Sequence, residues 1–179
     1  MRGYFGIGVE QISKEYNAGN LVRSAHAFGA SFFFTINSEL DLHKLRMSDT
    51  ADSFDHLPYH QFKTIEDMEL PKGCVLVGVE LVEDSIDLPS FRHPLRAAYV
   101  LGPEMGSLSP ALVERCDHVI KIPMKFCVNV GVAGAIVMYD RLLSMGRFAE
   151  RPVRAGGPAE QPEKLVFGLH RRKVRTKKK

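Results

Sequence analysis

The sequence predicts an α/β fold in which a mainly parallel sheet is flanked by helices. Two observations carry this prediction: short apolar runs typical of strands alternate with segments of helical periodicity, and glycine- or proline-containing turns directly follow two of those runs. The 179 residues, of which 45% are hydrophobic, are enough for one domain of ordinary size with its own core. This composition excludes a chain that is disordered throughout.

The chain is expected to begin with a strand, a helix and a second strand. Residues 4–9 form a short apolar run. A polar turn is expected over residues 13–19, and apolar residues then recur at helical spacing over 21–28, with Gly29 as the stop. Residues 31–36 contain three consecutive phenylalanines, which indicate a buried strand.

The middle of the chain is less regular. Residues 37–58 are polar and show no strong period, and residues 64–68 indicate a short helix before a proline. Residues 74–82 form an apolar strand, and residues 97–101 form another that runs directly into a glycine-rich turn. Because ligands bind outside the carboxyl ends of the strands in such sheets, this turn is a candidate binding site.

The last elements have clear boundary signals. Ser109 offers a capping hydroxyl before a proline, so a helix is expected from there to about Arg115. Residues 118–122 form a strand that Pro123 ends. Residues 129–145 form a long helix, apolar on nearly every face, with a glycine as its stop. A helix of this composition must be buried.

The composition changes after Arg151, where five proline and glycine residues lie within eleven positions and mark a linker. We therefore expect a domain over residues 1–150 and a linker with a basic, disordered tail over residues 151–179. The last ten residues hold seven basic side chains and no acid, whereas the rest of the chain has 17 basic and 21 acidic residues. The seven are Arg171, Arg172, Lys173, Arg175, Lys177, Lys178 and Lys179. Such a tail is either a solvated end or an arm that binds a polyanion such as nucleic acid.

Several functional classes are excluded by what the sequence lacks. No apolar run approaches the roughly 18 residues of a membrane-spanning helix, and no signal peptide is evident. Three widely spaced cysteines without a C-x-x-C pair indicate reduced thiols in a cytoplasmic protein. No phosphate-loop motif is present, and Gly6 and Gly8 begin a dinucleotide fingerprint that lacks its third glycine. His56 and His60 have metal-like spacing, but a proline lies between them, and no metal site is expected.

Three segments remain that are unusual in combination. Residues 17–23 (NAGNLVR) open the first helix, residues 101–109 (LGPEMGSLS) follow a strand, and residues 122–133 (IPMKFCVNVGVA) lead from a strand into the long helix. Together they resemble the N-x-G-x-x-x-R, G-x-E-x-x-G-L and I-P-M … S-L-N-V-S-V-A motifs of the SpoU-type RNA ribose 2′-O-methyltransferases of the SPOUT superfamily. Each motif alone is weak, but their order and separation make the resemblance specific, and it covers about residues 4–146.

The resemblance implies a fold and a reaction. Members of this family form a C-terminal trefoil knot that binds S-adenosylmethionine, and the same knot is expected here. The implied activity is methylation of a ribose 2′-OH in RNA, with tRNA as the favoured substrate and ribosomal RNA as the nearer alternative. Relatives form homodimers in which the long helix takes part, whereas the alternative is burial of this helix inside the monomer. The sequence shows no separate N-terminal RNA-binding domain, so a minimal catalytic-domain enzyme is expected.

The resemblance assigns catalytic positions to Arg23, Asn17, Glu104 and Asn129. Arg23 would clamp a phosphate and stabilise the oxyanion developing on the ribose, because a guanidinium almost never loses its proton. Without the motif, Arg23 would be a surface arginine paired with a nearby glutamate. Asn17 would orient Arg23 or cap the helix, or be a simple turn asparagine. Glu104 would fix the cofactor loop or hydrogen-bond to Asn17 or Arg23, and Asn129 would act near the target ribose and can also cap its helix.

The same resemblance assigns six residues to the S-adenosylmethionine pocket. They are Val79, Gly102, Ile122, Met124, Cys127 and Val132. Apolar residues at such positions are otherwise ordinary core residues. Cys127 stands where the family has a serine, and the stretch before it is shorter than in many relatives. A non-catalytic RNA-binding or ribosome-assembly protein therefore remains an alternative, whereas a nicotinamide-dependent oxidoreductase has no fingerprint here. In an RNA-binding enzyme, the basic tail is expected to contribute an electrostatic arm.

Overall fold

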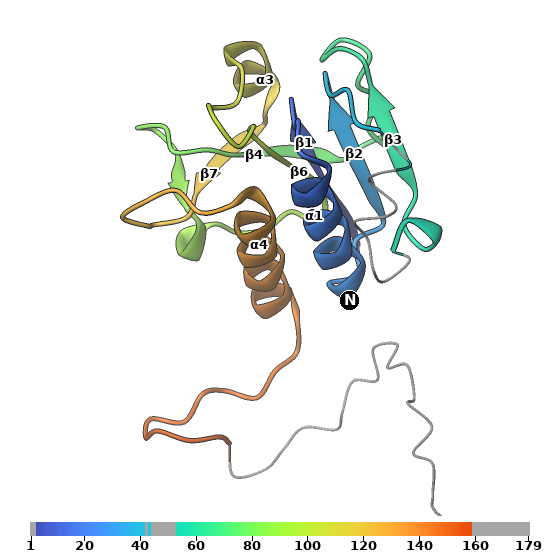
Figure 1. The fold of residues 1–179 in the computed structure, drawn as a ribbon. Helices are drawn as coiled ribbons and strands as arrows, with labels where there is room; N and C mark the ends of the chain where they lie inside the picture. The colour runs from blue at the N-terminus through green and yellow to red at the C-terminus, as the bar shows by residue number, and fades with distance from the viewer. Residues whose placement is uncertain (1–2, 42, 44–52, 159–179) are drawn as a thin grey trace, which may run out of the picture. The chain divides into compact units, whose positions relative to one another are not determined.

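The computed structural model describes residues 3–41, 43 and 53–158, and within them a seven-stranded sheet organises the chain (Figure 1). All strand pairs are parallel, in the order β3-β2-β1-β6-β4-β7-β5. The strands are β1 (Tyr4–Glu10), β2 (Phe32–Ile36), β3 (Tyr59–Phe62), β4 (Val75–Val79), β5 (Ile86–Asp87), β6 (Arg96–Leu101) and β7 (His118–Lys121). The helices are α1 (Glu15–Ala27), α3 (Pro110–Arg115) and α4 (Val130–Met145), with 3-10 turns η1 (Ser53–Asp55) and η2 (Leu88–Ser90). The predicted α/β fold with a parallel sheet is confirmed.

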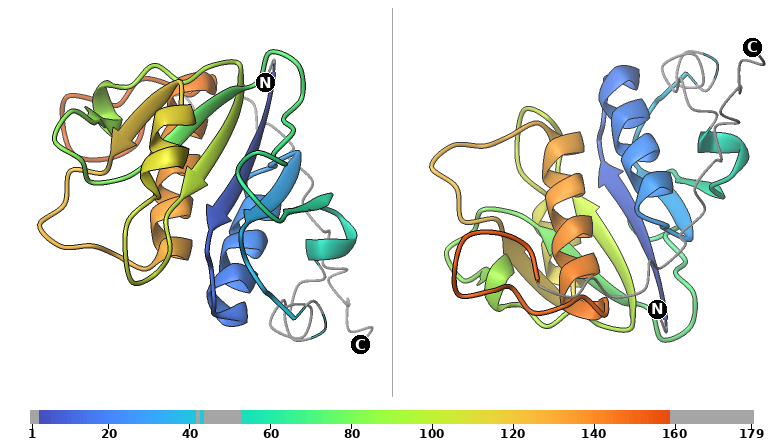
Figure 2. Two further views of the ribbon diagram at one scale, coloured as in Figure 1. Left: turned by 90° about the horizontal axis from the view of Figure 1, so that it is seen from above. Right: turned by 90° about the horizontal axis from the view of Figure 1, so that it is seen from below.

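The two faces of the sheet carry separate cores. Helices α1 and α4 lie side by side over one face of the sheet (Figures 1 and 2). Under them, Ile7 of β1 and Tyr99 of β6 pack in one cluster with Leu21 of α1. On the opposite face, Phe34 of β2 packs in a second cluster with Leu112 of α3. Strand residues alternate between the two faces, so both cores are built from the same strands.

Gly6 and Gly8 of β1 have a structural reason to be glycines. A Cβ atom at Gly6 would lie 2.2 Å from the Phe32 ring, and one at Gly8 would lie 2.5 Å from the Phe34 ring. The two glycines therefore make room for phenylalanines of the adjacent strand β2. They lie inside β1 rather than in a turn after it, which agrees with their rejection as a dinucleotide fingerprint.

The helix predicted at residues 64–68 is wrong. The described backbone there forms bends and turns without a helix. The amide of Met68 donates to the carbonyl of Ile65 over 3.1 Å, which closes a single turn. The Arg115 guanidinium of α3 then donates to the carbonyls of Ile65 and Met68. Carbonyls that would continue a helix are satisfied from outside, so the segment stays a turn.

The expected polar turn over residues 13–19 is also wrong, because α1 already begins at Glu15. The first turn of α1 contains polar residues, which are also typical of loops. The sequence did not predict strand β3, because β3 directly follows the polar residues 37–58 and contains no apolar run. It pairs with β2 alone at the edge of the sheet, and His60 and Gln61 are exposed there. Within residues 37–58, residues 42 and 44–52 lie outside the described part of the chain.

The predicted ends of the last two helices are confirmed. The Ser109 hydroxyl accepts a hydrogen bond from the amide of Leu112 and caps α3. The Asn129 side chain accepts one from the amide of Gly131 and caps α4, and Gly146 follows the last helical residue. Side chains that accept from free amides at a helix start stabilise it by about 1 kcal/mol each.

The chain separates into two compact units, Met1–Gly146 and Arg147–Lys179. In the second unit, the described residues 147–158 form neither helix nor strand. The predicted division at residue 150 stays a prediction, and the basic tail lies outside the described residues. Among the helices that are described, none is long and apolar enough to cross a membrane.

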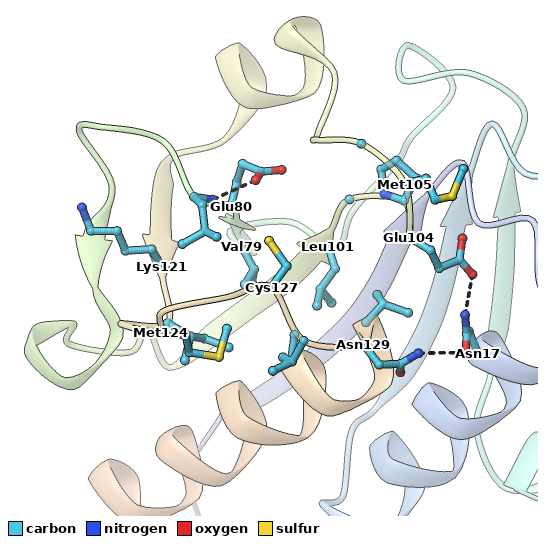
Figure 3. A pocket seen from close by; sticks show the side chains of 18 of the residues that line it. Asn17, Val79, Glu80, Leu101, Glu104, Met105, Lys121, Met124, Cys127 and Asn129 are labelled. Carbon is cyan, nitrogen blue, oxygen red and sulfur yellow. Dashed lines mark hydrogen bonds between the residues drawn. The ribbon is translucent and has the colours of Figure 1, made fainter.

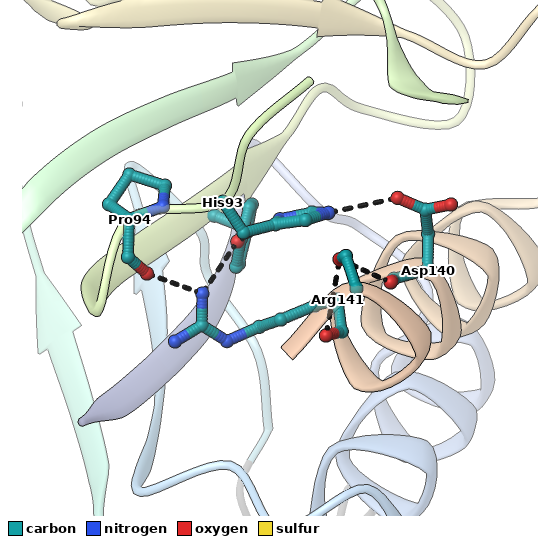
Figure 4. Close-up of polar contacts among 6 residues, drawn as sticks. His93, Pro94, Asp140 and Arg141 are labelled. Atoms are coloured by element: carbon teal, nitrogen blue, oxygen red, sulfur yellow. Dashed lines mark hydrogen bonds and ion pairs between the residues drawn. The ribbon is translucent and has the colours of Figure 1, made fainter. Parts of the chain in front are cut away.

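Arg141 ties α4 to the sheet from a fully buried position. Its side chain is 1% exposed, and its guanidinium donates to the carbonyl of Pro94 over 2.6 Å and to that of Leu95 over 3.1 Å (Figure 4). It also donates to the carbonyl of Tyr4 in β1 and to the Tyr99 hydroxyl in β6. The guanidinium carbon lies 5.2 Å from the centre of the Phe5 ring, also in β1. One side chain of α4 therefore satisfies carbonyls at the amino-terminal end of the sheet.

A buried chain of hydrogen bonds continues from this arginine. Arg141 donates to the Tyr99 hydroxyl over 3.1 Å, and the hydroxyl lies 2.5 Å from Nδ1 of His93. His93 Nε2 lies 2.9 Å from the Asp140 carboxylate (Figure 4). Because the carboxylate can only accept, His93 donates through Nε2, and its Nδ1 accepts from Tyr99. Burial raises the pKa of Tyr99 to about 12, so this hydroxyl keeps the proton that it donates.

The stability of the fold is expected to fall as the pH drops below about 6.5. Burial lowers the pKa of His93, although Asp140 opposes this shift. The unfolded chain therefore takes up a proton on His93 at a higher pH than the folded chain does, and acid favours unfolding. In urea titrations between pH 7 and pH 5, His93→Gln should show a smaller loss of unfolding free energy than the unchanged protein. His118→Gln, at an exposed histidine, controls for the substitution, and identical pH slopes for His93→Gln and the unchanged protein would contradict the assignment.

Candidate functional site

A cavity of about 470 Å³ lies at the carboxyl ends of β4, β6 and β7 (Figure 3). Parallel strands bring these ends to one edge of the sheet, where side chains from distant segments meet. The cavity is lined by residues 79–81 after β4, residues 101–106 after β6, and most of residues 121–130 after β7. Lys14 and Asn17 at the start of α1, with Ala133 of α4, complete it. The structure thus brings residues of all three motif segments to one cavity, together with the turn after β4, which belongs to no motif.

Three polar side chains form a relay at one end of this cavity. The Asn17 amide nitrogen donates to Glu104 Oε1 over 2.9 Å, and the Asn129 amide nitrogen donates to Asn17 Oδ1 over 2.9 Å (Figure 3). Asn129 Oδ1 accepts from the amide of Gly131, so Asn129 both caps α4 and joins the relay. Asn17 is only 8% exposed and lies within α1, so it neither caps the helix nor sits in a turn. The relay connects α1, the turn after β6 and the start of α4.

Arg23 lies on α1 and lines a second pocket, which is formed by residues of α1 and α4. Asn129 lines both pockets and so marks the place where they meet. Val132 lines the second pocket and is not among the lining residues of the cavity. Its expected contact with the cofactor stays a prediction. Ala133, the next residue of α4, does line the cavity.

The other five predicted cofactor residues, Val79, Gly102, Ile122, Met124 and Cys127, all line the cavity. Their role in binding stays a prediction. Cys127 is exposed, and its thiol lies within the cavity wall (Figure 3). Leu101 and Val130 also belong to the apolar wall but were not singled out from the sequence. Both are ordinary aliphatic residues at an element boundary, and nothing in their local sequence distinguishes them from core.

Charged residues at the cavity were also missed. Glu80, Lys14 and Lys121 line it, and none of them belongs to a motif. Glu80 directly follows the last residue of β4, whereas the predicted strand ran on to residue 82. Glu80 could have been found because it is an acidic residue in an otherwise apolar run. Such a residue indicates the end of the strand, where ligands bind in parallel sheets.

The residues of the cavity suit S-adenosylmethionine. Its volume falls in the range of small-molecule sites, and its wall combines apolar side chains with polar and charged groups. Ile122, Met124 and Ala133 give the wall aliphatic surface, and Lys14 and Lys121 give it cationic side chains. The described residues contain no group of His, Cys, Asp and Glu side chains that could hold a metal ion.

Comparison with known proteins identifies the family. The model of the SpoU rRNA Methylase family matches residues 5–139, which include all three motifs. The chain belongs to this family. The match spans the strands and helices that line the cavity, so the cavity is part of the shared domain.

Two curated relatives and one solved structure show how similar known proteins are to this chain. A tRNA (guanosine(18)-2'-O)-methyltransferase of Aquifex aeolicus is 25% identical over 143 residues, which cover 73% of this chain and 65% of the relative. The tRNA (guanosine(18)-2'-O)-methyltransferase TARBP1 of Mus musculus is 26% identical over 139 residues, covering 72% of this chain and 9% of the relative. This chain thus spans less than two thirds of both relatives. The SpoU methyltransferase AviRb from Streptomyces viridochromogenes, in complex with AdoMet, superimposes with a TM-score of 0.71 at 23% identity, over 80% of this chain and 61% of that one.

Proposed function

We propose that this SpoU-family chain is an S-adenosylmethionine-dependent RNA 2′-O-ribose methyltransferase that acts on tRNA. The observation that carries the proposal is the relay of Asn17, Glu104 and Asn129 at the end of a cavity built by the three family motifs. The curated relatives in Aquifex and mouse are named as tRNA 2'-O-methyltransferases, which supports tRNA as the substrate class. Ribosomal RNA stays the alternative substrate.

The roles of the residues follow from their places. S-adenosylmethionine, when bound, supplies an electrophilic methyl group. The 2′-oxygen of the ribose gains negative charge as its proton leaves, and a positioned cation stabilises that charge. Arg23 supplies this cation and binds the adjacent phosphate, while Asn129, shared by the two pockets, orients the ribose. Asn17 and Glu104 hold Asn129 in place through the relay.

We also propose that the chain forms a homodimer through α1 and α4. Val132 and Tyr139 of α4 are each 49% exposed, and with Phe28 and Ile136 they line the second pocket. The single chain therefore leaves apolar surface of α4 uncovered, which favours a dimer over burial inside the monomer. Arg23 lies in the same pocket, so the reaction would take place beside the interface.

The expected trefoil knot belongs to the same proposal. Strand β7 comes after β5 and β6 in the chain, yet it inserts between β4 and β5 in the sheet. The C-terminal part of the domain then passes from β7 through residues 122–129 into α4. This order of strands supports a C-terminal segment that is threaded through the earlier turns.

A cytoplasmic location is proposed from the cysteines. Cys74, Cys116 and Cys127 are free in the structure, as expected in a reducing compartment. Burial raises the pKa of Cys116 to about 12 and also raises that of Cys74, so these two thiols stay protonated and unreactive. The basic tail, which lies outside the described residues, is proposed as an additional contact to RNA phosphates.

The proposal is tested by methyl transfer. The protein is incubated with labelled S-adenosylmethionine and, separately, with tRNA and ribosomal RNA from cells that lack the gene. Nucleosides are then identified by mass spectrometry. A 2′-O-methylated nucleoside in the tRNA pool is the expected result, and one found only in the ribosomal pool would change the substrate. No transfer to either pool, with S-adenosylmethionine still bound, would favour a non-catalytic RNA-binding protein.

The mouth of the cavity is expected to bind the base of an RNA nucleotide. Phe126 is 84% exposed and lies between Met124 and Cys127, which both line the cavity, and Met105, 90% exposed, lines it from the turn after β6. Exposed aromatic side chains beside a lysine are typical of single-stranded RNA sites, where stacking on one base contributes about 1–3 kcal/mol. Phe126→Ala should therefore lower kcat/KM for RNA at least about 5-fold. Leu95→Ala, at an exposed apolar residue before β6, is the control, and equal values for the two variants would refute the contact.

A further inference from the structure

One carboxylate joins two of the three turns that form the cavity. Glu80, directly after β4, accepts a hydrogen bond from the amide of Leu81 on Oε1 over 2.8 Å (Figure 3). Its Oε2 accepts one from the amide of Leu108 over 2.7 Å. Leu81 belongs to the turn after β4, and Leu108 belongs to the turn after β6. Charge-assisted hydrogen bonds of this kind are stronger than neutral ones. Glu80 therefore acts as a clip between the turns.

The absence of a side chain at Gly102 leaves room for this contact between Glu80 and Leu108. A Cβ atom at Gly102 would lie 2.9 Å from the amide nitrogen of Leu108, 3.2 Å from the carbonyl carbon of Ser107 and 3.3 Å from Glu80 Oε2. Two of these atoms are backbone and cannot move aside without shifting the turn. Besides its place in the cavity wall, this glycine therefore leaves room for the hydrogen bond between Leu108 and Glu80.

A second carboxylate holds the same turn from the other side. Strand β6 lies between β1 and β4 in the sheet, so Glu10 at the end of β1 faces Glu80 across it. Glu10 is 1% exposed, and it accepts the amide of Ser109 over 2.7 Å and the Ser109 hydroxyl over 2.5 Å. Consecutive amides of the chain, Leu108 and Ser109, are thus bound by carboxylates from opposite neighbours. These bonds hold the C-terminal end of the turn, whose residues 102–106 line the cavity.

We propose that Glu80 is a positioning residue for the methyl donor, with Gly102 as the position that allows its contact. The proposal rests on the function proposed above. A glycine-rich turn has many conformations, and ordering it on binding would cost affinity. The clip orders residues 102–106 before the ligand arrives, so that part of the binding free energy is not spent on ordering. Glu80 acts through the turn and not on the reacting atoms.

The first test is binding of S-adenosylmethionine to Glu80→Gln, measured by calorimetry. The glutamine keeps the shape but lacks the charge, and it can accept only through one oxygen. We expect Kd to rise at least about 10-fold, because hydrogen bonds to charged groups are among the stronger ones. In methyl transfer, KM for S-adenosylmethionine should rise while kcat at saturation stays nearly unchanged. Glu83→Gln, an exposed acid on the same turn, is the matched control.

The second test is a double-mutant cycle with Gly102→Ala. The methyl group of the alanine would displace the amide of Leu108 from Glu80. Each substitution would therefore disrupt the same contact, the hydrogen bond between Glu80 and Leu108. We expect the double variant to lose about as much affinity as the weaker-binding single variant. Hydrogen exchange of the Leu108 amide should also become faster in Glu80→Gln, whereas exchange of Val100 inside β6 should not change.

The outcomes are distinct. If the unchanged protein fails to bind S-adenosylmethionine, the proposed function falls and this inference falls with it. If the unchanged protein binds and Glu80→Gln binds equally well, the inference alone is overturned. Effects of Glu80→Gln and Gly102→Ala that multiply in the double variant would overturn it as well, because the two changes would then act independently. Faster exchange at Val100 would show general destabilisation instead of a positioning role.

Discussion

Replacing Arg23 by lysine is expected to lower the rate of methyl transfer at least about 100-fold, although the positive charge is kept. The planar guanidinium can bind a phosphate and a developing oxyanion at fixed angles, and an ammonium cannot reproduce this geometry. Because Arg23 lines the second pocket and not the cavity, the affinity for S-adenosylmethionine should stay the same. Single-turnover transfer to RNA and calorimetry with S-adenosylmethionine measure the two effects separately.

The control for Arg23→Lys is Arg92→Lys, an exposed arginine that lines neither pocket. A guanidinium group keeps its proton across the accessible pH range and so cannot act as the base. The proton of the ribose hydroxyl must then leave through another group. Full activity of Arg23→Lys would refute the assigned role, and loss of S-adenosylmethionine binding would move Arg23 into the cofactor site.

Replacing Arg141 by methionine should lower the free energy of unfolding by about 3 kcal/mol, the range seen when a buried polar network is broken. The substitution leaves the carbonyls of Tyr4, Pro94 and Leu95 and the Tyr99 hydroxyl without this donor. Each buried acceptor without a partner costs about 1–3 kcal/mol, and removal of a buried charge offsets part of the sum. Urea unfolding measures the change.

Arg141→Lys separates charge from geometry. A lysine keeps the charge but cannot reach carbonyls on β1 and before β6 at the same time, so most of the loss should remain. Arg92→Met, at an exposed arginine in the same loop as His93, should change the unfolding free energy little. A stability of Arg141→Met close to that of the unchanged protein would show that α4 is held to the sheet by apolar packing alone.

The strongest sequence predictions were those with local physical causes. Helix α3 was placed by a capping serine and a proline, and these signals act within one turn of the helix. The buried strands were recognised because both of their faces are apolar. The edge strand β3 was not predicted, and a helix was wrongly predicted at residues 64–68. In both places the conformation depends on contacts with other segments. Pairing with β2 and capture by Arg115 come from segments far away in the chain.

The fold class, the three motifs and therefore the family to which the chain belongs follow from the residues alone. It also placed Asn17, Glu104 and Asn129 in one site, since motifs record side chains that a shared fold brings together. The packing of distant segments, in contrast, places Val132 at the second pocket, joins two turns through Glu80 and buries Arg141. These properties depend on which carbonyls, amides and side chains from distant strands lie within about 3 Å, the range of a hydrogen bond. Parallel strands set that proximity, because their carboxyl ends meet at one edge although they are far apart in the chain.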